Sequence, residues 1–353
     1  MKRVVFIVLI VFLLIPRNVH AFEIPQIEGY DMISEIAQLV SSGDLTINPI
    51  GIINNILMSL SYEVKTFSKT AAVILVMALL SSSVGILNTA LGERALTNAS
   101  FFTFFSVLSG LALNCFSQAL GYATEVTECM VLFMNKLTPI IILTLFTCCK
   151  SVSAASFEPI LSASVFVASE VITRCLIPMI SFSAVLSIAG NIGDKNNISG
   201  FIKIIKSTTK WIMTGMITIF TGINAIYGFA SPTLDALSAK TVKFAMGSLV
   251  PVVGGFLSDS LDTVLTSATV LKNAVGVSGI IIMCGICITP IIKIGIMQLL
   301  IRLISAVIEP ITDRRISGML WDVSGAITAL FSMVTLTSVL FIINISIIIR
   351  ATG

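Results

Sequence analysis

Long runs without a charged residue recur along the chain, and polar stretches separate them. A helix needs about 20 mainly apolar residues to cross the hydrocarbon core of a bilayer. Five of the runs are comfortably long enough, and two, Leu137–Cys149 and Cys175–Gly193, are borderline. The other runs are Thr70–Gly92, Ala95–Thr124, Trp211–Leu234, Asn273–Ile292 and Val323–Ile349. The pattern predicts an all-α, polytopic integral membrane protein with about five to seven transmembrane helices.

The N-terminal residues have the pattern of a secretory signal. Lys2 and Arg3 precede an apolar run from Val4 to Ile15, and Val19-His20-Ala21 has the small residues of a cleavage site. The run is too short to cross a bilayer, so we expect residues 1–21 to be a cleavable signal peptide rather than an anchor. The expected domains are then this signal, an extracytoplasmic helical region at 22–69 and a polytopic transmembrane domain at 70–353.

The second half of the region 22–69 predicts one amphipathic helix. Asn48-Pro49 suits a helix start, because asparagine caps helices and proline is tolerated in the first turn. Apolar residues then follow at helical spacing: Ile50, Ile53, Leu57, Leu60, Val64 and Phe67. This stripe has two open interpretations: packing on residues 27–42 or the membrane surface, or docking on another protein.

A basic stretch after the linker at 190–200 helps to orient the chain, because lysine and arginine beside membrane segments favour the cytoplasmic side. Its lysines share one helical face, and three apolar residues are available to the membrane interface: Lys203, Lys206 and Lys210, with Ile204, Ile205 and Trp211. Three crossings from outside place the stretch in the cytoplasm, so we expect Leu137–Cys149 to be re-entrant or to pair with its neighbour. The same count places Lys293, Arg302, Arg314 and Arg315 in the cytoplasm.

Composition excludes several kinds of chemistry. The chain is 56% hydrophobic and 11% charged, with a formal charge of +3 that falls to zero without the signal, so we expect no nucleic-acid partner. The single histidine, His20, leaves with the signal, which removes histidine-based catalysis from the mature chain. Cys284-x-x-Cys287 has no second pair to complete a metal site. We expect no enzyme activity, no metal and no cofactor.

One pair of embedded charges precedes a borderline membrane run. Glu170 and Arg174 are four residues apart, so they lie on one face of a helix with the acid N-terminal, the favourable order. Ionisable residues inside a membrane are candidates for function. A structural pair at the tip of a short helical hairpin is the alternative.

Helix breakers interrupt the uncharged stretch Met246–Leu257. Pro251 and the pair Gly254-Gly255 lie inside it, and its 12 residues are too few to cross a bilayer. We therefore predict a re-entrant or interfacial hairpin near 246–257. Non-helical backbone at membrane depth requires protein or a water-filled cavity around it, which predicts burial against other helices or along a pore.

Two carboxylates follow this stretch on one helical face. Asp259 and Asp262 are three residues apart and share a polar side with threonine and serine residues. They would coordinate a cation, pair with nearby lysines or line a passage. A solvated helix face is the plainer interpretation.

The sequence KFAMGSLVPVVGGFLSDSLDTVLTSATVLKNAVGVSG at 243–279 closely resembles the signature region of the stage III sporulation protein AE family of endospore-forming bacteria. The order of signal, small extracytoplasmic region and polytopic body is also similar across nearly the whole mature chain. By resemblance, the matching positions are candidate hairpin or conduit residues: Lys243, Gly247, Pro251, Gly254, Gly255, Asp259, Asp262, Lys272, Asn273 and Gly276.

The resemblance implies a place and partners for the chain. The family works in the mother-cell-derived outer forespore membrane after engulfment, as a subunit of a channel or feeding apparatus that spans both membranes. Implied partners are ring-forming components, a secretion-type ATPase, a forespore membrane protein and membrane lipids. The alternative function is a stand-alone secondary transporter for a small solute, with Glu170, Arg174, Asp259 or Asp262 coupling ions.

Overall fold

Eight helical segments make up the computed structural model of the protein, which describes residues 49–351 apart from 91–93, 148–150, 193–197 and 250–253. In chain order they are α3 (Pro49–Ala90), α4 (Arg94–Thr147), α5 (Ser151–Val171), the π-helix η1 (Ile172–Leu176), α6 (Ile177–Ile192), α7 (Ser199–Leu249), α8 (Gly254–Ile308) and α9 (Arg314–Ala351). The described residues contain no strand, so the all-α prediction is confirmed.

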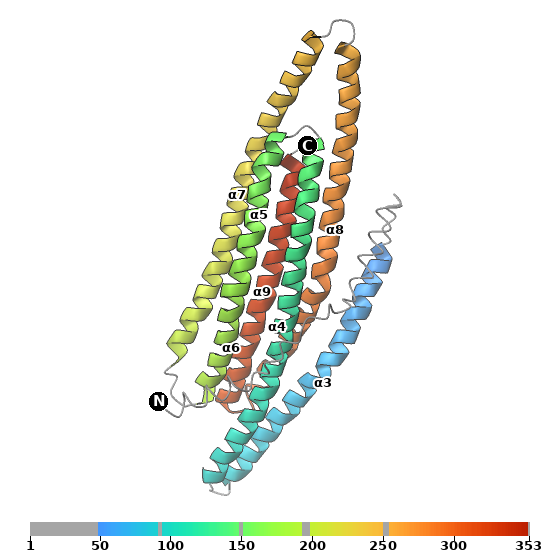
Figure 1. Ribbon diagram of the computed structural model, residues 1–353. Coiled ribbons are helices and arrows are strands. Elements are labelled where there is room, and N and C mark those ends of the chain that lie inside the picture. The colour runs from blue at the N-terminus through green and yellow to red at the C-terminus, as the bar shows by residue number, and fades with distance from the viewer. Residues whose placement is uncertain (1–48, 91–93, 148–150, 193–197, 250–253, 352–353) are drawn as a thin grey trace.

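The helices lie roughly side by side in an elongated bundle, and the chain reverses direction at each connection between them (Figure 1). Since α5, η1 and α6 follow one another without a gap, they form one helical rod. By length and composition, five segments of the described residues are able to cross a membrane: Glu63–Leu87, Leu96–Leu143, Ser162–Ile192, Val275–Ile308 and Arg314–Ser346. The prediction of a polytopic membrane protein is confirmed.

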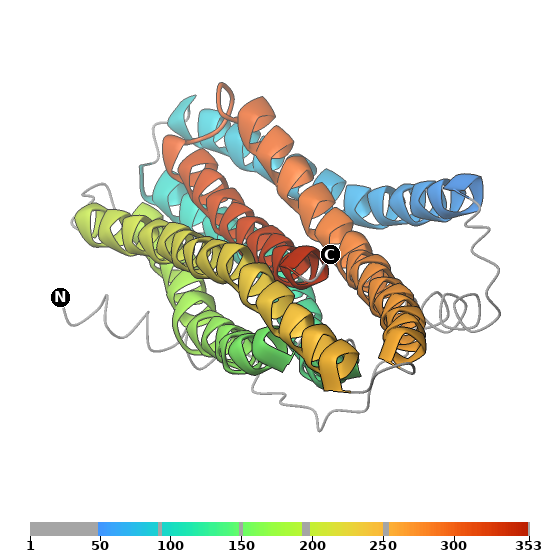
Figure 2. The same cartoon turned by 90° about the horizontal axis from the view of Figure 1, so that it is seen from above.

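Helix α9 is the central helix of the bundle. It packs against α4, α5, α6, α7 and α8, and Figure 2 shows it between α7 and α8. Its inward face repeats apolar residues at helical spacing: Ile316, Leu320, Val323, Ile327, Leu330, Val334, Phe341 and Ile345, all buried. Within the 18-residue apolar stretch that makes each helix a candidate membrane span, half of the α9 stretch is buried, against 17% of the α3 stretch. The α3 helix instead packs on α4 and α8 and exposes most of its apolar surface.

Helix α4 corrects the expected arrangement around residues 125–150. Leu137–Cys149 is not a re-entrant segment, because residues up to Thr147 continue α4, which also includes Ala95–Thr124. Charges in the sequence suggested a break, but they occupy only one side of the helix. The other side carries a continuous buried stripe: Val126, Met130, Met134, Leu137 and Ile141. Pro139 lies inside the helix without ending it.

A close contact between a glycine and a leucine side chain joins α8 to α4. A Cβ atom at Gly279 would lie 2.8 Å from the Cδ2 atom of Leu137, so glycine gives Leu137 the room it occupies. Gly276, one turn earlier in α8, is also buried. Small residues at helix crossings allow this kind of packing in membrane bundles.

The helix α3 begins at Pro49, as the sequence predicts. It then continues through residue 69 into the first predicted span, so the amphipathic region and that span are parts of one helix. Of the predicted stripe, Phe67 is buried and Val64 is exposed. Residues 1–48, which include the expected signal and the stretch 27–42, lie outside the described residues.

Candidate functional site

The predicted conduit residues fall at the connection between α7 and α8. Helix α7 ends at Leu249 and α8 begins at Gly254, so the predicted interruption separates two long antiparallel helices (Figure 1). Both helices are longer than the expected spans Trp211–Leu234 and Asn273–Ile292. The re-entrant or interfacial position of this connection stays a prediction.

The structure describes some of the predicted conduit residues more fully than others. Lys243 and Gly247 lie in α7, and α8 contains Gly254, Gly255, Asp259, Asp262, Lys272 and Asn273 as well as the buried Gly276. Pro251 lies outside the described part of the chain. The side chains of the other residues also lie outside it, with the exception of Gly276. Their proposed role at a passage stays a prediction.

Glu170 and Arg174 form the expected ion pair, but within a helical rod rather than at a hairpin tip. The carboxylate of Glu170, in α5, accepts from Arg174 Nε, one turn later in η1. The Arg174 side chain is 79% exposed. Pro178 has no N–H, so it cannot donate to the Arg174 carbonyl one turn earlier. The N–H of the preceding residue, Ile177, donates to the Ile172 carbonyl five residues back, which is the hydrogen bond of a π turn.

The structure brings together a second ion pair that the sequence pattern did not predict. Glu63 Oε1 on α3 lies 3.0 Å from Lys293 Nζ on α8, and the two side chains are 8% and 18% exposed. The Lys293 ammonium is 5.3 Å from the ring centroid of Tyr122 on α4. Three helices therefore meet around one charge pair, which we call the Glu63–Lys293 pair.

This pair defines the surroundings of Lys293. The lysine lies within the candidate span Val275–Ile308 and is largely buried in the bundle, and its expected cytoplasmic side stays a prediction. Burial is tolerated because the Glu63 carboxylate neutralises the ammonium and the Tyr122 ring faces it. A sequence signal was present: Lys293 is the single charge between Lys272 and Arg302, which is typical of an intramembrane ionisable residue.

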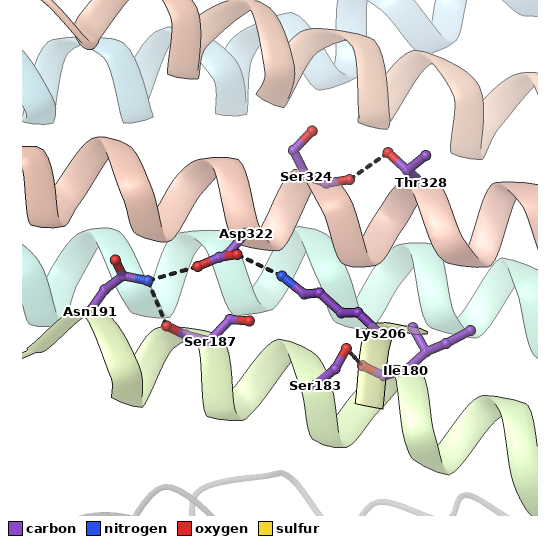
Figure 3. A network of polar contacts seen from close by, with 8 residues as sticks. All are labelled: Ile180, Ser183, Ser187, Asn191, Lys206, Asp322, Ser324 and Thr328. Atoms are coloured by element: carbon purple, nitrogen blue, oxygen red, sulfur yellow. Dashed lines mark hydrogen bonds and ion pairs between the residues drawn. The ribbon is translucent and has the colours of Figure 1, made fainter. Parts of the chain in front are cut away.

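A third group of polar side chains, the Asp322 cluster, joins α6, α7 and α9. Lys206 Nζ lies 2.6 Å from Asp322 Oδ1, and Asn191 Nδ2 donates to Asp322 Oδ2 at 2.9 Å. Asn191 also donates to the Ser187 carbonyl, at 2.7 Å. Figure 3 shows Asn191 and Lys206 directed at Asp322 from two neighbouring helices. About one third of the Asp322 and Lys206 side chains is exposed.

Local sequence allows the Asp322 cluster to form. A Cβ atom at Gly318, one turn before Asp322, would lie 2.8 Å from Asn191 Oδ1, so a glycine there lets the amide approach α9. Because each partner comes from a different helix, the cluster fixes their relative register. It is only partly buried, so its contribution to stability is that of a surface contact.

The start of α7 has an outer apolar surface, as expected, with one exception. Ile204 and Trp211 are 63% and 75% exposed. Ile205, which we expected at the membrane interface, is buried against Leu186 of α6. Lys206 also turns inward, to Asp322.

No group of three or more histidine, cysteine, aspartate or glutamate side chains able to hold a metal occurs among the described residues. What the geometry does offer is paired charges between helices. A buried ionisable pair among candidate membrane segments is a candidate for function.

Comparison with known proteins identifies the family. The sequence profile of stage III sporulation protein AE matches residues 30–352. The stage III sporulation protein AE of Bacillus subtilis (strain 168) is 26% identical over 310 residues, which cover 88% of this chain and 78% of that protein. No solved structure matches the chain. The matched range contains the stretch 243–279 and all of the described helical bundle, and the chain belongs to the stage III sporulation protein AE family.

Proposed function

We propose that the chain is a membrane subunit of the channel that connects mother cell and forespore after engulfment. In this proposal it lies in the outer forespore membrane and carries out no chemistry of its own. A partner secretion-type ATPase supplies energy, and ring-forming components continue the passage toward the forespore. Membership of a sporulation family and five candidate membrane segments support the proposal.

The observation that carries the proposal is the length of the helices. Helices α4, α7 and α8 contain 54, 51 and 55 residues. At 1.5 Å per residue they are roughly 75–85 Å long, more than twice the thickness of a hydrocarbon core of about 30 Å. A protein that only crosses the membrane needs no such length. Long helices that continue beyond the bilayer offer partners a rigid surface, as an assembled apparatus requires.

The connection between α7 and α8 is the favoured place for partner contact. The two helices extend beyond the rest of the bundle at this end (Figure 1). The predicted carboxylates Asp259 and Asp262 belong to the first turns of α8. In the proposal they lie at the mouth or wall of the conduit.

One observation favours a second function, transport of a small solute by the chain alone. The Glu63–Lys293 pair is a buried charge pair among candidate membrane segments, and such pairs couple ion movement in some transporters. This function predicts solute uptake by vesicles that contain the purified chain and a gradient.

Deletion of the gene in the native sporulating host tests the proposed function. We expect development to stop after engulfment, with small or collapsing forespores, because the forespore loses its supply through the channel. Membrane staining records the stage of arrest. A plasmid copy of the intact gene is the control and restores spores. Normal spore formation in the deletion strain would contradict the proposal.

A further inference from the structure

Two charged side chains stand on the outer surface of the helical rod that α5, η1 and α6 form. Glu170 and Arg174 belong to consecutive turns, and their side chains are 36% and 79% exposed. The rod packs against α4, α7 and α9, and Figure 2 shows it, in green, at the edge of the described bundle. The pair therefore lies on a face that no described helix covers.

The pair also belongs to a candidate membrane segment, Ser162–Ile192, which is 31 residues long. A helix needs about 20 residues to cross the hydrocarbon core. Every stretch of about 20 residues within this segment contains Arg174, and most of them also contain Glu170. The guanidinium thus belongs to the crossing part of the segment, whichever of its residues meet the two membrane surfaces.

Lipid is a poor surrounding for this face. Charged side chains inside a membrane are costly and almost always face other protein or water. The Arg174 Nε–H donates to Glu170, but a guanidinium has four further N–H donors. Hydrocarbon offers no acceptor for them. An exposed pair at this position therefore predicts that another protein surface covers the rod.

Small side chains beside the pair allow another helix to come close. They recur at helical spacing, and each is at least partly exposed: Ser162, Ser169, Thr173 and Ser181. Interfaces between membrane helices are enriched in small residues of this kind. Phe166, one turn before Glu170, is 65% exposed and adds apolar surface. The face thus has the composition of a contact between membrane helices.

The charges on this face are complementary to the same face of a second copy. Two copies in one membrane have the same orientation, so a two-fold axis along the membrane normal relates them. Around that axis, Glu170 of each copy lies beside Arg174 of the other, one turn away. The arginine side chain is long enough for that distance, because it reaches Glu170 of its own chain across one turn. Both pairs between the copies form together.

We propose that a second copy of this chain packs on the outer face of the α5–η1–α6 rod through Glu170 and Arg174. Each guanidinium keeps its bond to Glu170 of its own chain and donates to Glu170 of the other chain. The four charged groups then form one closed network, with Thr173 of both copies near the axis. A channel subunit and a transporter are both compatible with a dimer, so this proposal and the proposed function are tested separately.

Disulfide cross-linking of the full chain in its native membrane tests the proposal. Two differently tagged copies of Thr173→Cys are expressed together, and mild oxidation joins cysteines whose Cα atoms are close. Thr103→Cys is the matched control, because Thr103 is an exposed threonine in the candidate segment of α4. We expect about tenfold more product with both tags from Thr173→Cys, since a disulfide requires Cα atoms within about 7 Å. The chain with only its native cysteines gives the background.

Charge reversal in separate copies distinguishes a contact between chains from the ion pair within one chain. Arg174→Glu gives a chain with two acids at the contact, and Glu170→Arg gives a chain with two bases. When each is combined with Thr173→Cys and expressed alone, we expect about tenfold less cross-linked dimer, because like charges face each other. Expressed together, the two variants should recover the dimer. Neither variant has the ion pair within its own chain, so that pair does not explain a recovery.

Three results would overturn the proposal. The first is cross-linking at residue 173 that does not exceed the Thr103→Cys control. The second is a product that never carries both tags, which would identify a different protein on this face. The third is a mixture of the reversed variants that stays uncross-linked although immunoblots show both in the membrane. Thr173→Cys keeps both charges, so the first comparison holds even if a reversed variant does not accumulate.

Discussion

Replacement of Lys293 by alanine is expected to destabilise the bundle by about 3–5 kcal/mol, because it leaves the Glu63 carboxylate buried without a partner. The two side chains are 8% and 18% exposed, so water replaces little of the lost interaction. The Tyr122 ring also loses the cation that it faces. Thermal unfolding of the purified chain in one detergent measures the difference.

Two further variants make this prediction specific. Glu63→Leu combined with Lys293→Met removes both charges and keeps apolar volume, so we expect stability close to that of the intact protein. Lys203→Ala removes an exposed lysine and is the matched control. If Lys293→Ala unfolds at the same temperature as Lys203→Ala, the pair is not the buried contact that the structure describes.

The same double variant distinguishes the two functions. A channel subunit needs the Glu63–Lys293 pair only for folding, so a stable double variant should restore sporulation in the deletion strain. A transporter that couples ions through this pair would lose activity although it remains folded. Sporulation counts and protein levels in the membrane fraction, measured together, separate these outcomes.

Asp259→Ala combined with Asp262→Ala is expected to abolish sporulation while the protein still accumulates in the membrane. The two positions are three residues apart in α8, so they share one side of the helix. In the proposed conduit they carry the negative charge of its mouth or wall, and alanine keeps the helix while it removes that charge. Spore counts and immunoblots of membranes from the complemented deletion strain measure the effect.

Controls for the two aspartates come from the same helix. Ser260→Ala changes a neighbouring polar residue without changing charge and should leave sporulation intact. Asp259→Asn combined with Asp262→Asn removes both charges but keeps the side-chain shape, and it should also abolish sporulation. Loss of the protein from the membrane in the alanine variant would indicate a role in folding instead of in the conduit.

Hydrophobic periodicity predicts the class of this fold because the bilayer imposes a minimum helix length. It predicts helix ends less well. Glu125, Glu128 and Lys136 interrupt the apolar run in the sequence, yet α4 continues past all three. A helix continues while its backbone hydrogen bonds and its buried apolar stripe continue. In α4 the buried stripe continues through Met130 and Met134.

The pattern of a single segment does not predict which residues pair inside the bundle. Lys293 was identifiable as a lone charge in an apolar run, but nothing local indicates that its partner, Glu63, lies 230 positions earlier in the chain. The same holds for Asp322, which is the single charge between Arg315 and Arg350 and pairs with Lys206. Partners of this kind are set by which helices become neighbours, and that depends on the whole bundle.

The central claim, that the chain works within an assembled apparatus, is tested most directly by its isolation from sporulating cells. A C-terminal affinity tag and a mild detergent recover the chain after engulfment, and mass spectrometry identifies what accompanies it. The channel proposal predicts a large assembly that contains other membrane proteins, ring-forming components and the ATPase. A chain that migrates alone, and whose purified form drives gradient-dependent solute uptake in vesicles, would contradict it.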